Sequence, residues 1–219
     1  MNHIAIGNEM VSLSTKARSL GVIFDNKLSL NHHINNMCKV LYLEIRWISQ
    51  LSNYLDNNSL KVLISAFVFS RIDYCNSLLI NLPADVLSKL QRIQNSAARL
   101  VFKKSKREHI TPLLKELHWL PIKAWIEYKI ALYCFKCFHN TTPLYLSDLL
   151  EKYEPSRSLR SSNKYLLKIK NANHKKLGGR SLSVSGPAIW NSLPPDMRQI
   201  NKESTFKRNL KTHLFCKHL

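Results

Sequence analysis

The chain has 219 residues, 45% of them hydrophobic, and carries 33 Lys and Arg against 14 Asp and Glu, a net charge of +19. This hydrophobic content excludes a disordered tail, and 5 Gly with 8 Pro argue against an all-β protein, which needs many tight turns. Repulsion among so many like charges disfavours a compact chain unless a polyanion offsets it, so RNA, DNA or another anionic surface is the expected partner. The alternative is a basic protein whose lysines are merely solvated.

Residues 1–28 are expected to form a small β element. Short apolar runs at residues 4–6 and 20–24 are bounded by turn signals, such as Gly7 followed by Asn8. Two or three short strands are not stable alone in water. The element is therefore expected to pack on the helices that follow, or on structure encoded upstream.

Residues 29–151 predict a helical bundle, because apolar residues recur there at intervals of three and four. Ser29 or Asn31 is the expected N-cap of the first helix. The second helix is apolar nearly all round, so it is expected to be the most buried. Helices are expected over residues 29–51, 57–79, 83–100, 111–117, 122–138 and 144–150.

A cluster of cations follows the third of these helices. Four of the five residues from 103 to 107 are basic, namely Lys103, Lys104, Lys106 and Arg107. Such a cluster fits a nuclear-import patch, a loop that contacts phosphates, or a solvated loop. The exposed face of the preceding helix adds Arg92, Asn95 and Arg99.

Residues 152–219 are expected to form a basic loop and helix region. They hold 15 basic and 3 acidic side chains, a net charge of +12, against +7 for residues 1–151 with 18 basic and 11 acidic side chains. Residues 154–180 read as a loop rich in Ser, Asn, Lys and Arg that includes Lys175, Lys176 and Arg180. Pro187 is expected to open a short helix, and residues 202–214 to form a basic amphipathic helix.

The sequence shows no catalytic constellation. Its acidic residues are scattered singly, without the paired carboxylates that hold Mg²⁺, and no Gly-rich phosphate loop or G-x-S-x-G motif is present. No apolar run approaches the ~20 residues of a membrane span, so no membrane partner is expected. Five Cys at irregular spacing indicate reduced thiols, in the cytoplasm or nucleus.

The Cys-x-x-Cys pair of Cys134 and Cys137 raises the question of zinc. Structural zinc needs four ligands, and His139, His213, Cys216 and His218 are the other candidates. The pair falls within a helical pattern, however, and free Cys is common in a protein core. We therefore assign no metal and no cofactor to this chain.

Several long segments resemble the C-terminal part of the open reading frame of non-LTR (LINE, jockey-like) retrotransposons of animals. The order and spacing of the segments agree over residues 17–215. The segments are ARSLGVIFDNKLSLNHHI (17–34), FVFSRIDYCNSLLINLP (67–83), LQRIQNSAARLVFKKSKREHITPLLKELHWLPI (90–122), LYLSDLL (144–150), SVSGPAIWNSLPPDMR (183–198) and STFKRNLKTHLF (204–215).

The resemblance implies that residues 1–28 follow the palm of a reverse transcriptase and that residues 29–151 form its helical thumb and connector. The family's paired catalytic aspartates, its Mg²⁺ and its endonuclease belong to upstream segments. The chain is therefore expected to be a truncated, catalytically inactive remnant that binds an RNA or RNA–DNA duplex and packs on the palm and fingers. A stand-alone nucleic-acid-binding adaptor and a non-functional translated fragment are the alternatives. The expected phosphate contacts are Lys103, Lys104, Lys106, Arg107, Lys175, Lys176 and Arg180.

Overall fold

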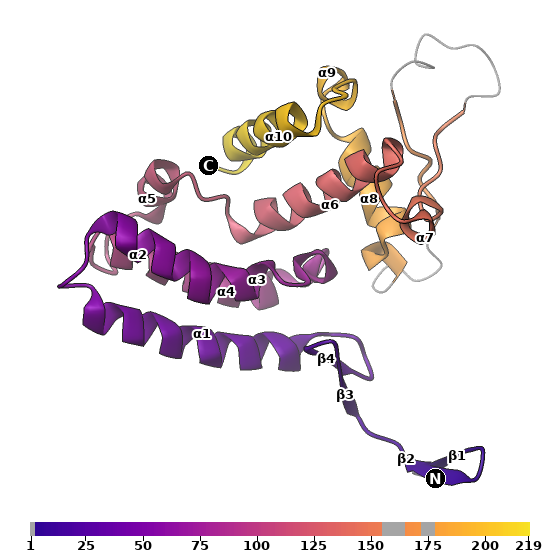
Figure 1. Cartoon of the computed structure of the whole chain (residues 1–219), viewed down its shortest axis with the longest axis horizontal. Helices are drawn as coiled ribbons and strands as arrows, with labels where there is room; N and C mark the ends of the chain where they lie inside the picture. Colours follow the sequence, from indigo (N-terminus) through magenta and orange to yellow (C-terminus); the bar gives the residue numbers. More distant parts are fainter. Residues whose placement is uncertain (1–2, 155–164, 172–177) are drawn as a thin grey trace.

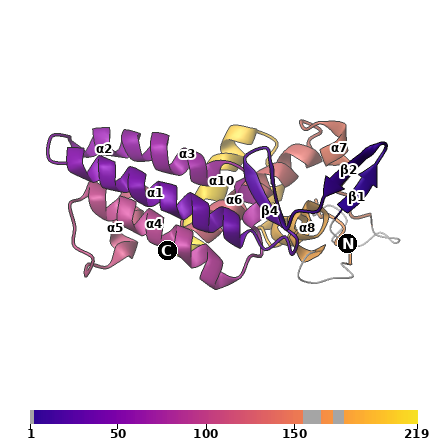
Figure 2. The same ribbon diagram turned by 90° about the horizontal axis from the view of Figure 1, so that it is seen from below.

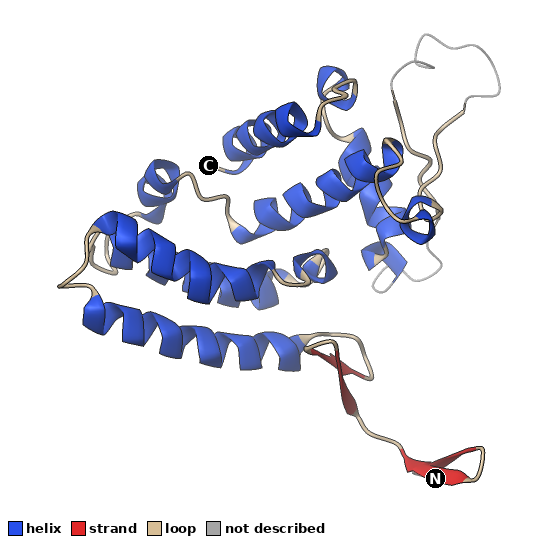
Figure 3. Cartoon of the chain, in the orientation of Figure 1, coloured by secondary structure: helices blue, strands red, loops and turns tan. Residues whose placement is uncertain are grey.

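The computed structural model describes residues 3–154, 165–171 and 178–219. Helices dominate this part of the chain, and its strands lie within the first 25 residues, so the predicted mainly α fold with a small N-terminal β element is confirmed (Figure 3). The strands are β1 (His3–Ile6), β2 (Glu9–Ser12), β3 (Lys16–Ser19) and β4 (Val22–Asp25). The α-helices are α1 (Asn31–Leu51), α2 (Asn57–Ile64), α3 (Ser70–Asp73), α4 (Ala84–Val101), α5 (Ile110–Leu117), α6 (Ile122–Phe138), α7 (Leu144–Ser147), α8 (Leu182–Asn191), α9 (Pro195–Arg198) and α10 (Glu203–His218). A π-helix, η1 (Ser65–Phe69), joins α2 to α3, and short 3₁₀-helices form η2 (Asn76–Leu79) and η3 (Gly178–Arg180).

The β element consists of two separate antiparallel hairpins. In β3–β4 the two turn residues, Leu20 and Gly21, have φ of 46° and 81°, as a type I′ turn requires. This hairpin packs on α1 and buries Val22. The β1–β2 hairpin has exposed side chains throughout and projects away from the helices (Figure 1). The prediction that the β element packs on the helices therefore holds for β3–β4 alone.

The helices form layers around a continuous apolar core. α1 packs on α4, with α2, η1 and α3 beside them (Figure 2). α6 lies on the other side of α4 and is covered in turn by α8 and α10 (Figure 1). Buried residues of all these elements belong to one hydrophobic cluster, so the C-terminal helices are part of the main core.

The predicted helix over residues 57–79 is interrupted. Its buried residues Leu60, Ile64, Val68 and Ile72 recur every four residues, which advances 40° beyond a full α-helical turn at each step. The π-helical turn η1, with its wider spacing, keeps these side chains facing the core. The prediction that this is the most buried helix is wrong, because Val62 is 66% and Phe67 is 46% exposed.

Pro187 lies inside α8, five residues after the helix begins, so the prediction that it opens a helix is wrong. The neighbouring Gly186 allows this segment to lie close to α6. A Cβ placed on Gly186 would lie 3.0 Å from the Sγ of Cys134. Close packing of α8 on α6 therefore depends on Gly186.

The C-terminal ends of α4, α5 and α6 share one backbone geometry. α4, α5 and α6 each end in a residue with a left-handed backbone, namely Lys103, His118 and Asn140, with φ of 52°, 54° and 54°. In each case the two N–H groups after the helix donate to carbonyls of its last turn, which is the Schellman arrangement. Glycine is the usual residue at this position, and none of these helices has one.

Candidate nucleic-acid interface

The basic loop, defined as residues 102–109, joins α4 to α5 and has a fixed backbone at its start. The N–H of Lys103 donates to the carbonyl of Leu100 (3.2 Å), and the N–H of Lys104 donates to that of Arg99 (2.9 Å). The guanidinium of Arg99 also donates to the carbonyl of Glu108 at 3.2 Å. Both ends of the loop are thereby held against the C-terminus of α4.

The four predicted cations all lie in this loop with exposed side chains. Lys104 forms an ion pair with Glu108 at 3.3 Å, at a surface position where such a pair contributes little stability. Lys103, Lys106 and Arg107 form no ion pair with any residue that the structure describes. The structure therefore brings together three exposed, uncompensated cations on an anchored loop.

Two arginines of α4 extend this charge. Arg92 is exposed and Arg99 is partly exposed, and they lie seven residues apart on one face of α4, with Arg99 four residues before Lys103. The sequence placed them on the polar face without assigning them a role. Their helical spacing toward Lys103 was the available signal that they belong to the same surface.

Arg180 has a different environment from the other predicted contacts. Its guanidinium is half-buried and donates to the carbonyls of Leu28 and Leu78, the latter at 3.0 Å. Burial lowers the pKa of Arg180, and the nearby Asp25 carboxylate opposes that change. Arg180 thus joins the segment after β4 to η2, and both terminal nitrogens of its guanidinium already donate to backbone carbonyls. Lys175 and Lys176 lie outside the described residues.

Cys134 and Cys137 both lie in the core. Burial raises the pKa of Cys134 far above its usual value, so the thiol stays protonated, and its Sγ faces Gly186 of α8. The Sγ of Cys137 lies 3.7 Å from the carbonyl of Leu146. Within the described ranges no three His, Cys, Asp or Glu side chains come together as metal ligands would.

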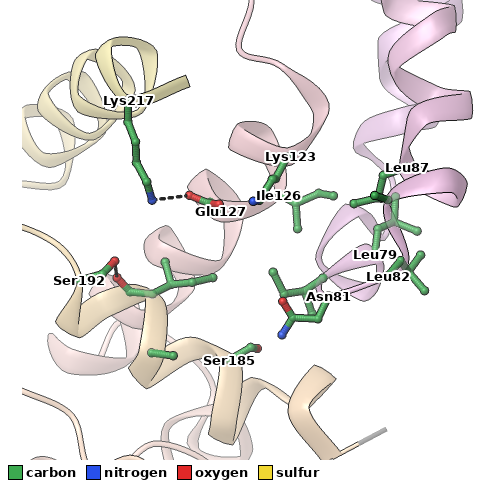
Figure 4. Close-up of a pocket in the computed structure, with 14 residues that line it drawn as sticks. Leu79, Asn81, Leu82, Leu87, Lys123, Ile126, Glu127, Ser185, Ser192 and Lys217 are labelled. Atoms are coloured by element: carbon green, nitrogen blue, oxygen red, sulfur yellow. Dashed lines mark hydrogen bonds and ion pairs between the residues drawn. The ribbon is translucent and has the colours of Figure 1, made fainter. Parts of the chain in front are cut away.

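A separate cleft of about 530 Å³ opens between η2, α6, α8 and the end of α10 (Figure 4). Glu127 of α6 accepts hydrogen bonds from Lys217 and His218 of α10, each at 3.1 Å. Burial opposes ionisation of Glu127, but these two partners outweigh it and lower the pKa of Glu127. The carboxylate therefore anchors the C-terminal end of α10, and Lys123 is left as the cleft's remaining cation.

Substituting Lys103 with Gly should stabilise the chain, although it removes one of the cations of the basic loop. A left-handed backbone costs a residue with a Cβ about 1–2 kcal/mol, so Lys103→Gly should raise the free energy of unfolding by about 1 kcal/mol. Urea denaturation followed by circular dichroism measures this. Lys103→Ala removes the same charge without relieving the backbone, so it should not stabilise the chain. Equal stabilities of the two variants would contradict the helix-end geometry.

No helix in the described part of the chain is long and apolar enough to cross a membrane. Comparisons of the chain with protein-family models, with curated proteins and with solved structures find no match. A functional assignment therefore depends on the chemistry of the surfaces described above.

Proposed function

We propose that this chain binds the phosphate backbone of an RNA or RNA–DNA duplex through the basic loop and the adjoining arginines of α4. The observation that carries the proposal is the set of uncompensated cations Lys103, Lys106 and Arg107 on an anchored loop. Lysine and arginine neutralise phosphates and displace condensed counterions, which favours binding without regard to base sequence. The net charge of +19 supports the same kind of partner.

The resemblance to non-LTR retrotransposons gives this binding a context. In that context the helical bundle acts as the thumb and connector of a reverse transcriptase and holds the template–primer, while the family's catalytic carboxylates belong to its palm. The β1–β2 hairpin fits this proposal, because the apolar side chains of Ile4, Ile6 and Met10 are exposed. Under this proposal the hairpin would extend a palm sheet.

A salt titration with a matched pair of variants tests the proposal. Affinity for a short, blunt RNA–DNA duplex should be measured by fluorescence anisotropy at several salt concentrations. The logarithm of the binding constant should fall with the logarithm of salt by about 0.9 per phosphate contacted, several units in all. Replacing Lys103, Lys106 and Arg107 with Gln should lower this slope by about 2–3 units, because three phosphate contacts are lost.

The control removes the same charge elsewhere. Lys27, Lys39 and Arg46 are exposed on α1 and the segment before it, and no ion pair to a described residue involves them. Their triple Gln variant also carries three fewer charges, but it should change the slope by less than about one unit. Equal losses in the two variants, or a slope near zero for the unmodified chain, would refute the proposed interface.

A further inference from the structure

An aromatic pocket of about 260 Å³ lies where the end of η1, the α5–α6 junction and α10 meet. This volume is below the range of pockets that enclose drug-sized ligands, so it suits a single flat ring system. Its aromatic and charged lining consists of the side chains of Phe69, His118, Trp119, Trp125, Tyr128 and Lys211.

Local structure explains why these rings converge. The left-handed backbone of His118 ends α5 and reverses the chain, which brings Trp119 back toward the core. Trp125 and Tyr128 follow on α6 at a spacing of three residues, so they share one face of that helix. Phe69 meets both indoles edge-on, with centroid distances of 4.4 Å to Trp119 and 5.5 Å to Trp125.

The polar atoms of this pocket have capacity left for a ligand. Trp119, Trp125 and Tyr128 are only partly buried, and neither the indole N–H groups nor the phenol O–H donates a hydrogen bond within the described part of the chain. Burial raises the pKa of Tyr128, while Lys207 opposes that change, so the phenol keeps its proton. A bound ring could therefore both stack and accept a hydrogen bond.

The charge at the pocket favours an anionic ligand. Lys211 lines it and forms no ion pair with a described residue. None of the described side chains lining the pocket is acidic. The carboxylate that affects Tyr128, Glu203, is itself paired with Lys207 at 2.7 Å and Lys136 at 3.5 Å. An aromatic cage for a cation would need the opposite charge pattern.

We infer that this pocket holds one unpaired nucleobase, stacked on the Trp119 and Trp125 indoles, with the adjoining phosphate at Lys211. Stacking on aromatic side chains tolerates any base, so the pocket selects unpaired over paired nucleotides and not one sequence over another. The inference rests on the proposed function for the rest of the strand. α5 spans eight residues, about 12 Å, so the basic loop and the pocket are about three or four stacked nucleotides apart.

The test compares two RNA–DNA duplexes with identical phosphates. One carries a four-nucleotide single-stranded overhang, and the other carries the same overhang built from abasic nucleotides. The unmodified chain should bind the overhang with bases about 5- to 100-fold more tightly, and tryptophan fluorescence should be quenched by that overhang alone. Trp125→Leu should remove the difference in affinity, whereas Trp47→Leu, at an exposed site on α1, should keep it.

The possible outcomes distinguish a failure of the pocket inference from a failure of the proposed duplex binding. Blunt-duplex binding with a normal salt slope, but equal affinity for the two overhangs, would overturn the pocket and leave the basic loop standing. Quenching by uridine monophosphate alone supports the pocket even if duplex binding fails. Quenching by tetramethylammonium but not by uridine monophosphate would identify a cation cage and overturn the inference. Should Trp125→Leu fail to fold, quenching by uridine monophosphate should be compared in Lys211→Gln and Lys39→Gln, and only Lys211→Gln should weaken it, because Lys211 contacts the phosphate.

Discussion

Replacing Trp190 with Ala is expected to lower the free energy of unfolding by about 3–5 kcal/mol. Trp190 is fully buried, and its ring stacks on Phe138 of α6 and lies beside Phe206 of α10. Its indole N–H donates to the carbonyl of Tyr165 at 2.7 Å. One side chain thus joins α6, α8, α10 and residues 165–171, and its removal leaves a large cavity. Urea denaturation followed by far-ultraviolet circular dichroism measures the loss.

Trp190→Phe is the matched control for this substitution. It keeps most of the stacked ring and removes the hydrogen bond to Tyr165, so the loss should be about 1–2 kcal/mol. A loss below about 1 kcal/mol for Trp190→Ala would mean that α8 and α10 do not share the core of the preceding helices. A loss confined to a separate early transition would mean that they unfold as their own unit.

Helices bounded by strong local signals were predictable from the sequence. α6 begins and ends at the predicted residues, because Pro121 precedes it and a polar Asn-Thr-Thr-Pro run follows. α4 was equally clear, since Pro83 sets its start. In both cases the residues that stop the helix lie within a few positions of its ends, so no tertiary information was needed.

The π-helical turn η1 and the position of Pro187 inside α8 were not predictable, because tertiary packing determines both. The π-helical turn η1 leaves no signal in composition, and a four-residue apolar spacing looks helical until its drift is followed over several turns. Pro187 normally marks a helix start, but it lies inside α8, next to the close contact between Gly186 and Cys134 of α6. At both sites, contacts between segments distant in sequence outweigh local helix propensity.

Some residues of the candidate site were likewise predictable from the sequence, and others come together only in the structure. The cations from Lys103 to Arg107 are adjacent in sequence, so their clustering needed no structure. Arg180 looked like one more surface cation, but its carbonyl partners Leu28 and Leu78 lie more than 100 residues away. The aromatic pocket draws on four elements from Phe69 to Lys211, a convergence that no short sequence window contains.

Replacing Asp25 with Ala is expected to lower the free energy of unfolding by about 2–4 kcal/mol. The sequence offered Ser29 or Asn31 as the cap of α1, and the Ser29 hydroxyl does accept the N–H of Asn31, the first residue of the helix, at 3.3 Å. Asp25 holds the turn that leads into α1. Its carboxylate, only 9% exposed, accepts the N–H groups of Lys27, Ser29 and Leu30 at 3.0–3.1 Å and the hydroxyl of Ser29 at 2.9 Å. Ala would leave these donors, including the buried N–H of Leu30, without an acceptor.

This contribution should also depend on pH, with a defined sign. Burial opposes ionisation of Asp25, but the hydrogen bonds from Ser29, Lys27 and Leu30 outweigh it and lower the pKa of Asp25 below its ordinary 3.8. The unfolded chain therefore binds the proton first, so the stabilisation is complete above the ordinary pKa and is lost as pH falls through the folded value. Asp25→Asn removes the ionisable group, so its stability relative to the unmodified chain should improve as the pH is lowered. Urea denaturation at a series of acidic pH values tests this, and a constant difference between the two chains would show that Asp25 does not stabilise the turn before α1 as a carboxylate.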